Sequence, residues 1–202
     1  MPTKTKRKFS LSNKLQQAKN TFNEFPRQFW IMVAAAFIDR LGGAMLFPFF
    51  TLYLTKKFGI SMTQVGLIFG VFSISGLLGN LVGGALTDRL GRKGMLLFGL
   101  VMSALSALLM GVVNQIEWFI VVVLVVGILA DSGGPAQQAL VADLLPEEKR
   151  AQGFGILRVV FNLAITIGPL IGGLIATQSY LMLFIIDAIT SLLTAALVYF
   201  TL

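Results

Sequence analysis

Five ionisable side chains fall within long apolar stretches of this sequence. They are Asp39, Arg40, Asp131, Arg158 and Asp187. A charge at the centre of a bilayer costs at least ~2.5 kcal/mol on insertion scales, so it is retained only with a partner or with water. A carboxylate beside an arginine is a workable proton site, because protonation breaks the pair and a substrate can compete for it. We therefore take such residues as candidates for proton coupling or for the wall of a substrate cavity.

Depth along the helices indicates which of these side chains can meet. At 1.5 Å per helical residue, Asp39 lies about 15 Å from the cytoplasmic end of its helix, Asp131 about 18 Å and Arg158 about 9–12 Å. These three are expected to meet near mid-membrane, with Arg40 as an alternative cation. The competing interpretation is a structural ion pair that fastens helices together. Asp187 is expected to be structural and to pair with Arg40.

Composition identifies the elements that must position these residues. Apolar residues make up 56% of the 202 residues and charged residues only 12%, and the mean hydropathy is +0.84. A soluble domain carries about 25% charged residues. The chain is therefore expected to be an all-α integral membrane protein. It has neither cysteine nor histidine, which excludes disulfides and Cys-ligated metals and leaves any proton chemistry to carboxylates. No cofactor or metal is expected.

Hydropathy divides the chain into six spans, each near the ~20 residues that a bilayer requires. The expected spans are Phe29–Leu54, Thr63–Leu86, Gly94–Val113, Trp118–Leu144, Gln152–Ala176 and Ser179–Leu202. Twelve of the 16 basic residues lie in the N-terminal segment and in the loops 87–93 and 145–151. The positive-inside rule then predicts that both termini are cytoplasmic, and this distribution follows topology rather than forming a nucleic-acid-binding face.

Two domains follow from this division. Residues 29–202 form the six-helix lobe. Residues 1–28 are basic, with apolar residues recurring at helical spacing, which predicts an amphipathic helix on the membrane surface. A solvated tail is the alternative for that segment, and no cleaved signal peptide is expected.

The loop after the second span carries the most specific motif. Residues 84–96 read GALTDRLGRKGML. Gly91 allows a sharp turn at the membrane surface, and Arg89, Arg92 and Lys93 hold the loop on the cytoplasmic side. Asp88 can pair with these cations. This string, which begins at Gly84, resembles the cytoplasmic loop between the second and third helices of a major facilitator transporter.

The fifth span carries a second pattern of small residues. It consists of Gly155, Ala164, Gly168, Pro169, Gly172 and Gly173. The pattern resembles the antiporter signature of drug-exporting facilitators, with Ala164 where that signature has glycine. Pro169 cannot donate a helical hydrogen bond, so a bend is expected there. Generic tight packing with no bearing on transport is the alternative, since small residues allow close helix contact in lipid.

The resemblance extends to Asp143 and the basic loop after the fourth span, and it covers residues 29–202. It implies the N-terminal six-helix half of a major facilitator, in which two such halves enclose the substrate path. It also implies that Asp88, Arg92 and Asp143 form a cytoplasmic charge cluster. By the same resemblance, the first, fourth and fifth helices face the cavity and the sixth is peripheral. The third span has no charged residue, and its only polar residues are Ser103 and Ser106, so it is expected to be a lipid-facing peripheral helix.

The function expected from these features is proton-coupled efflux of small amphipathic or drug-like compounds across a plasma or bacterial inner membrane. The sequence has no phosphate loop and no nucleophile–base pair, so an enzyme is not expected. A second six-helix half or a second copy is the expected partner, and the small-residue faces that include Gly66, Gly70, Gly168 and Gly172 are the expected contact of a homodimer. The competing hypothesis is an isolated or engineered lobe that folds or dimerises without transport.

Overall fold

The structure is a computed structural model that describes residues 23–202. The interfacial helix expected in residues 1–28 falls almost wholly outside this range, so it stays a prediction. Within residues 23–202 every regular element is a helix and there is no strand. The expected all-α class is therefore confirmed.

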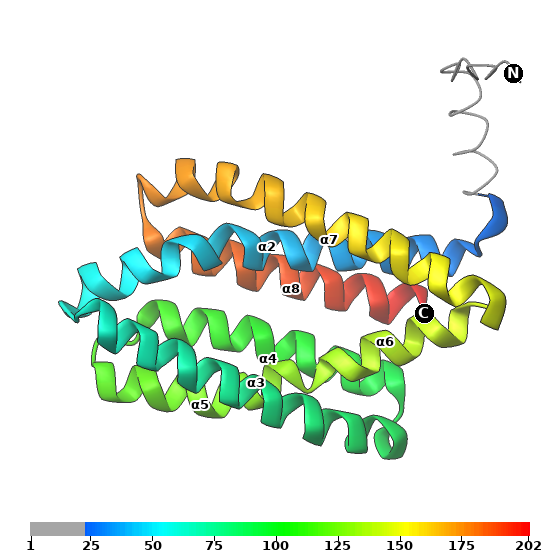
Figure 1. Ribbon diagram of the computed structural model, residues 1–202, viewed down its shortest axis with the longest axis horizontal. Coiled ribbons are helices and arrows are strands. Elements are labelled where there is room, and N and C mark those ends of the chain that lie inside the picture. The colour runs from blue at the N-terminus through cyan, green and yellow to red at the C-terminus, as the bar shows by residue number, and fades with distance from the viewer. Residues whose placement is uncertain (1–22) are drawn as a thin grey trace, which may run out of the picture.

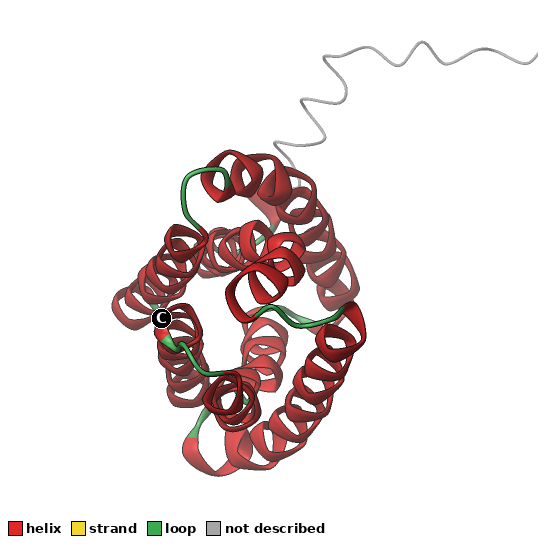
Figure 2. Ribbon diagram, turned by 90° about the vertical axis from the view of Figure 1, so that its left-hand side faces the viewer, coloured by secondary structure: helices red, strands yellow, loops and turns green. Residues whose placement is uncertain are grey.

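Within residues 23–202, six helical segments are long and apolar enough to cross a membrane. The helices are α2 (Arg27–Phe58), α3 (Met62–Leu90), α4 (Arg92–Val112), α5 (Ile116–Asp131), α6 (Gly133–Leu144), α7 (Glu147–Ala176) and α8 (Tyr180–Thr201). They run side by side along the long axis of the molecule (Figure 1), and α5 and α6 together form the fourth span. Seen from one end, they are grouped around a common centre (Figure 2).

Several helices extend beyond the apolar windows from which the spans were predicted. The clearest case is α7, which begins at Glu147, after the N-cap Pro146, and not at Gln152. Its first turn contains Glu147 and Glu148, whose negative charges are favourable at the positive N-terminal end of a helix. A hydropathy window detects only the part of a helix that lies in lipid, so it misses polar turns of this kind.

Local signals set the connections between helices. Gly59 ends α2 with a φ of 66°, and Ser61 starts α3 with a capping box in which the Ser61 N–H donates to Gln64 Oε1 at 2.9 Å. Gly91 joins α3 to α4 with a φ of 87°. A side chain in that left-handed region would be strained, which agrees with the turn expected at Gly91.

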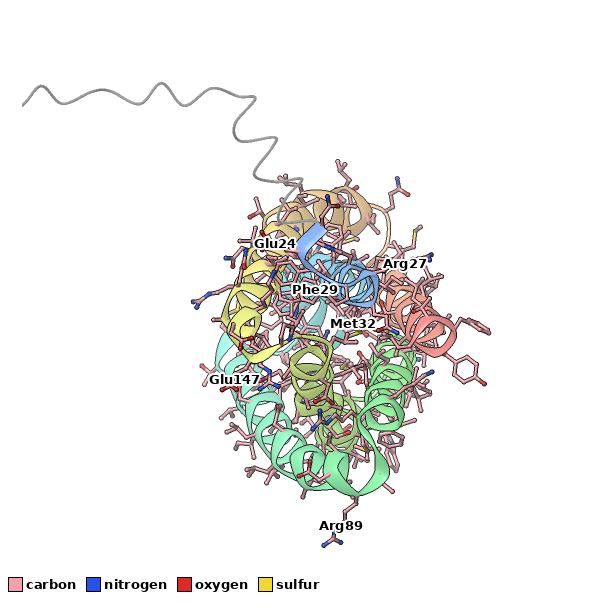
Figure 3. The ribbon with its side chains drawn as sticks, turned by 90° about the vertical axis from the view of Figure 1, so that its right-hand side faces the viewer. Glu24, Arg27, Phe29, Met32, Arg89 and Glu147 are labelled. Carbon is pink, nitrogen blue, oxygen red and sulfur yellow. The ribbon has the colours of Figure 1, made fainter. Side chains whose placement is uncertain are left out.

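Two apolar clusters occupy opposite ends of the lobe. One surrounds Phe29 and Met32, close to the start of α2, and these two side chains point inward in the end view (Figure 3). The other surrounds Phe50, Phe119 and Phe184 near the opposite end of α2. Because the two clusters fill the ends, the polar residues of the spans are left to the middle of the bundle.

Glycines allow the helices to cross at close range. Gly76, Gly79 and Gly83 of α3 lie against the end of α5, and a Cβ added at Gly83 would lie 2.6 Å from Ser132 Cα. Gly99 of α4 and Gly133 of α6 are equally close, because a Cβ added at Gly99 would lie 2.6 Å from Gly133 Cα. These backbone contacts are the small-residue packing that holds helices together where lipid supplies no hydrophobic drive.

The antiporter-like glycines of α7 pack within the chain. A Cβ at Gly168 would lie 2.8 Å from the Ala44 carbonyl carbon, and one at Gly172 would lie 3.0 Å from Met45 Cα, so both glycines face the α2 backbone. Their expected role in a contact between two copies is therefore wrong, because α2 already occupies this face. Gly66 and Gly70, by contrast, have open space where a Cβ would stand.

Candidate functional site

The fourth span is interrupted inside the membrane. α5 ends at Asp131, Ser132 lies between the helices, and α6 begins at Gly133. Pro135 has no N–H to donate to the carbonyl of Asp131, four residues earlier. The Ser132 hydroxyl donates to the Leu129 carbonyl at 2.7 Å and so satisfies one acceptor near the break. The helix is thus interrupted at the single residue Ser132, whose φ of −62° and ψ of −20° stay in the right-handed helical region.

A cavity of about 1020 Å³ lies beside this interruption and opens to the outside of the lobe, since Phe47 and Leu77 of its lining are exposed. Its polar lining includes the carboxyl groups of Asp39, Asp131 and Asp187 and the guanidinium of Arg40, and much of its wall is aromatic or aliphatic. The aromatic lining residues are Phe47, Phe50, Phe69 and Phe72. The cavity therefore combines an apolar surface with an excess of acidic groups.

A smaller cavity of about 330 Å³ adjoins the first. The two share Arg40 and Asp131 in their linings, and the smaller one adds Arg158. Its wall also carries the amides Asn80, Gln137 and Gln138. The structure thus places Asp131 with Arg40 and Arg158, as expected, whereas Asp39 and Arg158 line different cavities.

No ion pair is formed at these cavities. Among residues 23–202, cations and carboxylates lie within 4.0 Å of each other only at Arg92–Asp143 and Lys149–Glu24. The guanidinium of Arg40 lies over the Phe161 ring instead, 4.8 Å from its centroid, an attraction of the cation–π type. The expected pairing of Arg158 with Asp39 or Asp131 is therefore not formed in this structure.

Asp39 is held by a hydroxyl from another helix. Ser191 of α8 donates its Oγ–H to Asp39 Oδ1 at 2.9 Å, and the Ser103 hydroxyl of α4 lies 3.5 Å from Ser191 Oγ. Thr194, one turn further along α8, donates to the Ala35 carbonyl at 3.1 Å. These bonds fix α8 against the side of α2 that bears the carboxylate.

The expectations for the third and sixth spans hold only in part. α4 exposes Phe98, Val101 and Leu105, as expected of a lipid-facing helix. Its other side lines the large cavity with Ser103 and Ser106 and packs against α5, α6 and α8. Asp187 of α8 lines the same cavity and forms no ion pair with Arg40 within the described chain. A lone serine in an apolar run has little effect on hydropathy, which is why the sequence did not reveal these positions.

Aromatic residues near the outer end of α2 and amide residues of α6 and α7 are divided between the cavity walls and other positions. Phe47, Phe50, Gln137 and Gln138 line one or other cavity, whereas Phe49, Tyr53 and Asn162 line neither. Tyr53 belongs to the apolar cluster at the outer end, where its hydroxyl donates to the Met110 carbonyl at 2.6 Å.

The cytoplasmic loops carry the second group of expected residues. Arg92 forms an ion pair with Asp143 and also donates to the Ala139 carbonyl at 3.3 Å, so it joins the start of α4 to the end of α6. Asp88 and Arg89 are exposed and have no ion pair in the described part of the chain, and Arg89 points away from the lobe (Figure 3). The structure therefore unites two of the three expected members of the charge cluster.

A scan against protein-family models matches residues 32–202 to the Major Facilitator Superfamily. The chain belongs to this superfamily. The expected resemblance to a major facilitator transporter is thereby confirmed, and with it the assignment as a multi-pass membrane protein of a transporter family.

Curated relatives within the superfamily include transporters of different kinds. An uncharacterised MFS-type transporter of Bacillus subtilis, YttB, is 32% identical over 177 residues, which is 87% of this chain and 44% of the relative. A Na⁺, Li⁺, K⁺/H⁺ antiporter of Planococcus maritimus is 32% identical over 77% of this chain and 38% of its own length. The quinolone resistance protein NorA of Staphylococcus aureus is 28% identical over 78% and 40%, respectively. The chain spans less than half the length of these facilitators.

Proposed function

We propose that this chain is one half of a secondary active transporter that couples proton movement to the efflux of small amphipathic or drug-like compounds. The observation that carries the proposal is the cavity of about 1020 Å³ whose lining combines three aspartates with four phenylalanines. The relatives support it, because they include a quinolone resistance protein and a proton-linked cation antiporter.

The chemistry of the cavity suits an exchange of a proton for a substrate. An ionised aspartate in the membrane interior costs about 2.5–3.5 kcal/mol on insertion scales. Asp39 and Asp131 lack an ion-pair partner within the described residues, so either a proton or a cationic group of the substrate would relieve this cost. The two compete for the same carboxylates, and such competition is a means of coupling their movements.

The wall of the cavity suits the apolar part of an amphipathic compound. Ligand pockets for small molecules commonly measure about 300–1,000 Å³ and are mostly apolar with a few polar groups. The larger cavity, at about 1020 Å³, lies at the upper end of that range. Phe47, Phe50 and Phe72 would contact rings of the substrate, while the carboxylates would attract its cationic group.

A second six-helix half is the partner required by this proposal, supplied either by further chain or by a second copy. In α3 and α7, less of the apolar window is buried than in the other spans, at 28% and 17% respectively. The large apolar side chains exposed on these helices include Leu67, Leu77 and Leu81 of α3 and Val159 and Leu170 of α7. We place the second half against these faces, with both termini of the chain in the cytoplasm of a bacterial cell.

Flux measurements test the proposed function. In liposomes that contain the protein, an inward proton gradient is expected to drive efflux of a cationic amphipathic dye. Asp88→Asn is expected to leave membrane insertion unchanged, because Asp88 is exposed. It is expected to lower this flux, because we propose that Asp88, with Arg92 and Asp143, stabilises one end of the conformational cycle. Dye movement that ignores the gradient would reject proton coupling. The absence of flux with and without a second half would favour the competing hypothesis of a lobe that does not transport.

The partner face can be located by cross-linking, since the chain has no cysteine of its own. Cysteines at Gly66 and Gly70 are expected to cross-link to the partner half, because open space adjoins both positions. A cysteine at Gly172 serves as the matched control and is expected to stay unreacted, since that position faces α2. Cross-links through Gly172 alone would contradict this arrangement.

Alkali-cation exchange for protons is a second candidate function. It is favoured by the excess of carboxylates over arginine in the larger cavity and by the relative that exchanges Na⁺, Li⁺ or K⁺ for protons. The same liposomes distinguish the two, because proton movement driven by Na⁺ or K⁺ without any organic substrate would establish cation exchange.

A further inference from the structure

Asp187 of α8 lies beside Asp39 of α2 in the interior of the lobe. The Asp187 carboxylate oxygen Oδ1 is 2.9 Å from the place that a Cβ of Gly42 would occupy, and 3.9 Å from that of Gly43. Side chains three and four residues apart are neighbours on a helix surface. Asp187 therefore occupies the space one turn along from Asp39, on the same face of α2.

This position is available because α2 has no side chains there. A Cβ at Gly42 would overlap Thr190 as well as crowd the Asp187 carboxylate. The glycine pair thus forms a recess in α2 that receives the acidic side chain of α8. Both carboxylates line the large cavity beside this recess.

Hydroxyl groups connect the two acids to α4. Ser191 lies one turn along α8 from Asp187 and donates to Asp39 Oδ1 at 2.9 Å, and the Ser103 hydroxyl is 3.5 Å from Ser191 Oγ. The Asp187 carboxylate receives no hydrogen bond from residues 23–202, and it is partly exposed where its residue lines the cavity. Within the described residues, no donor satisfies this acceptor.

The charges that face this pair do not compensate it. On α2 the neighbouring Arg40 is turned to the Phe161 ring, and from α5 a third carboxylate, that of Asp131, lines the same cavity. Arg158 of α7 lines only the adjoining cavity, and the residues of α3 and α4 that line the large cavity are uncharged. Two neighbouring carboxylates with so little positive charge cannot both be ionised at low cost.

We propose that Asp39 and Asp187 hold one proton between them and that this shared proton is the one exchanged during transport. The proton resides on one of the two carboxyl groups at a time, so that the pair carries a single negative charge. Loss of the proton leaves two negative charges at the recess, which a cationic substrate group in the cavity can stabilise. This inference rests on the proposed function, and it places the coupling site entirely within this lobe.

Infrared spectroscopy of the protein in lipid nanodiscs tests the sharing directly. The carbonyl band of a protonated carboxyl group is followed during a pH titration of the wild type, Asp39→Asn and Asp187→Asn. Because a neighbouring negative charge disfavours ionisation, the wild-type band is expected to persist to a pH about one unit or more above that of either variant. Both variants are expected to affect the same band, since the proton belongs to the pair.

Two further variants separate this effect from a folding defect. Asp187→Glu keeps the second carboxylate, so its band is expected to persist to the same high pH as that of the wild type. Asp131→Asn removes the cavity carboxylate that lies outside the pair and is expected to leave the difference between wild type and Asp187→Asn unchanged. Thermal unfolding of each variant identifies any that is misfolded.

Three results would overturn the shared proton. The first is titration of Asp39 at the same pH with and without Asp187. The second is a separate band for each acid, lost independently. The third is release of the proton when Na⁺ replaces choline, which would reassign the pair to an alkali cation. The titration requires no transport, so an uncoupled pair leaves the efflux proposal standing, whereas a coupled pair without flux rejects the efflux proposal alone.

Discussion

Asparagine in place of Asp131 is expected to reduce proton-driven flux about tenfold or more, equivalent to about 1.4 kcal/mol in the transport barrier. Asp131 lines both cavities and stands at the break in the fourth span. The amide keeps the shape of the side chain but carries no negative charge for a cationic substrate group to contact. The remaining flux, measured in liposomes with an imposed gradient, is expected to keep its dependence on pH, because the exchanged proton is proposed to belong to Asp39 and Asp187.

Glu117→Gln is the matched control for this substitution. Glu117 lies in the first turn of the same helix, α5, where it is exposed and lines neither cavity. Its loss is expected to leave the flux and its pH profile unchanged. An identical pH dependence in the wild type, Asp39→Asn and Asp131→Asn would exclude both aspartates as proton carriers.

Alanine at Gly172 is expected to destabilise the lobe by about 1–3 kcal/mol, the usual cost of overpacking a close contact. The added methyl group would overlap the Met45 carbonyl and lie 3.0 Å from Met45 Cα. The backbone of α2 cannot give way as a flexible side chain can, so α7 must move outward. A lower thermal unfolding temperature in nanodiscs is the expected result.

Gly155→Ala tests whether the loss is specific to the contact. Gly155 is on the same helix, but open space surrounds the position of its added Cβ. Alanine is a better helix former than glycine by up to ~1 kcal/mol, so this variant is expected to be as stable as the wild type or more so. Equal losses at Gly155 and Gly172 would show that packing against α2 is not the cause.

The sequence predicted the spans well because the energy of placing a residue in lipid depends mainly on its own chemistry. It predicted heights within the membrane for the same reason, since 1.5 Å per residue converts position to depth. It could not predict which way a side chain faces around the helix axis. Arg158 and Asp39 were therefore expected to meet, although they line different cavities.

Spacing of small residues has a related limit. Gly66 and Gly70 have the same separation as Gly168 and Gly172, yet only the second pair contacts another helix of this chain. The spacing shows that a backbone can approach closely, and the partner is set by the tertiary arrangement. The contribution of α8 to the cavity was missed for a similar reason. Asp187 reaches its position beside α2 only because Gly42 leaves a recess there.

The interruption at Ser132 also divides the fourth span into two helices, α5 and α6. α6 is only 12 residues long, about 18 Å at the rise of a helix, and it carries Asp143, the partner of Arg92, near its far end. α6 is held to α4 at both ends, because Gly133 packs against Gly99 and Asp143 pairs with Arg92 at the start of α4. One short helix that packs along α4 thus connects the surroundings of Asp131 with an ion pair at the cytoplasmic surface.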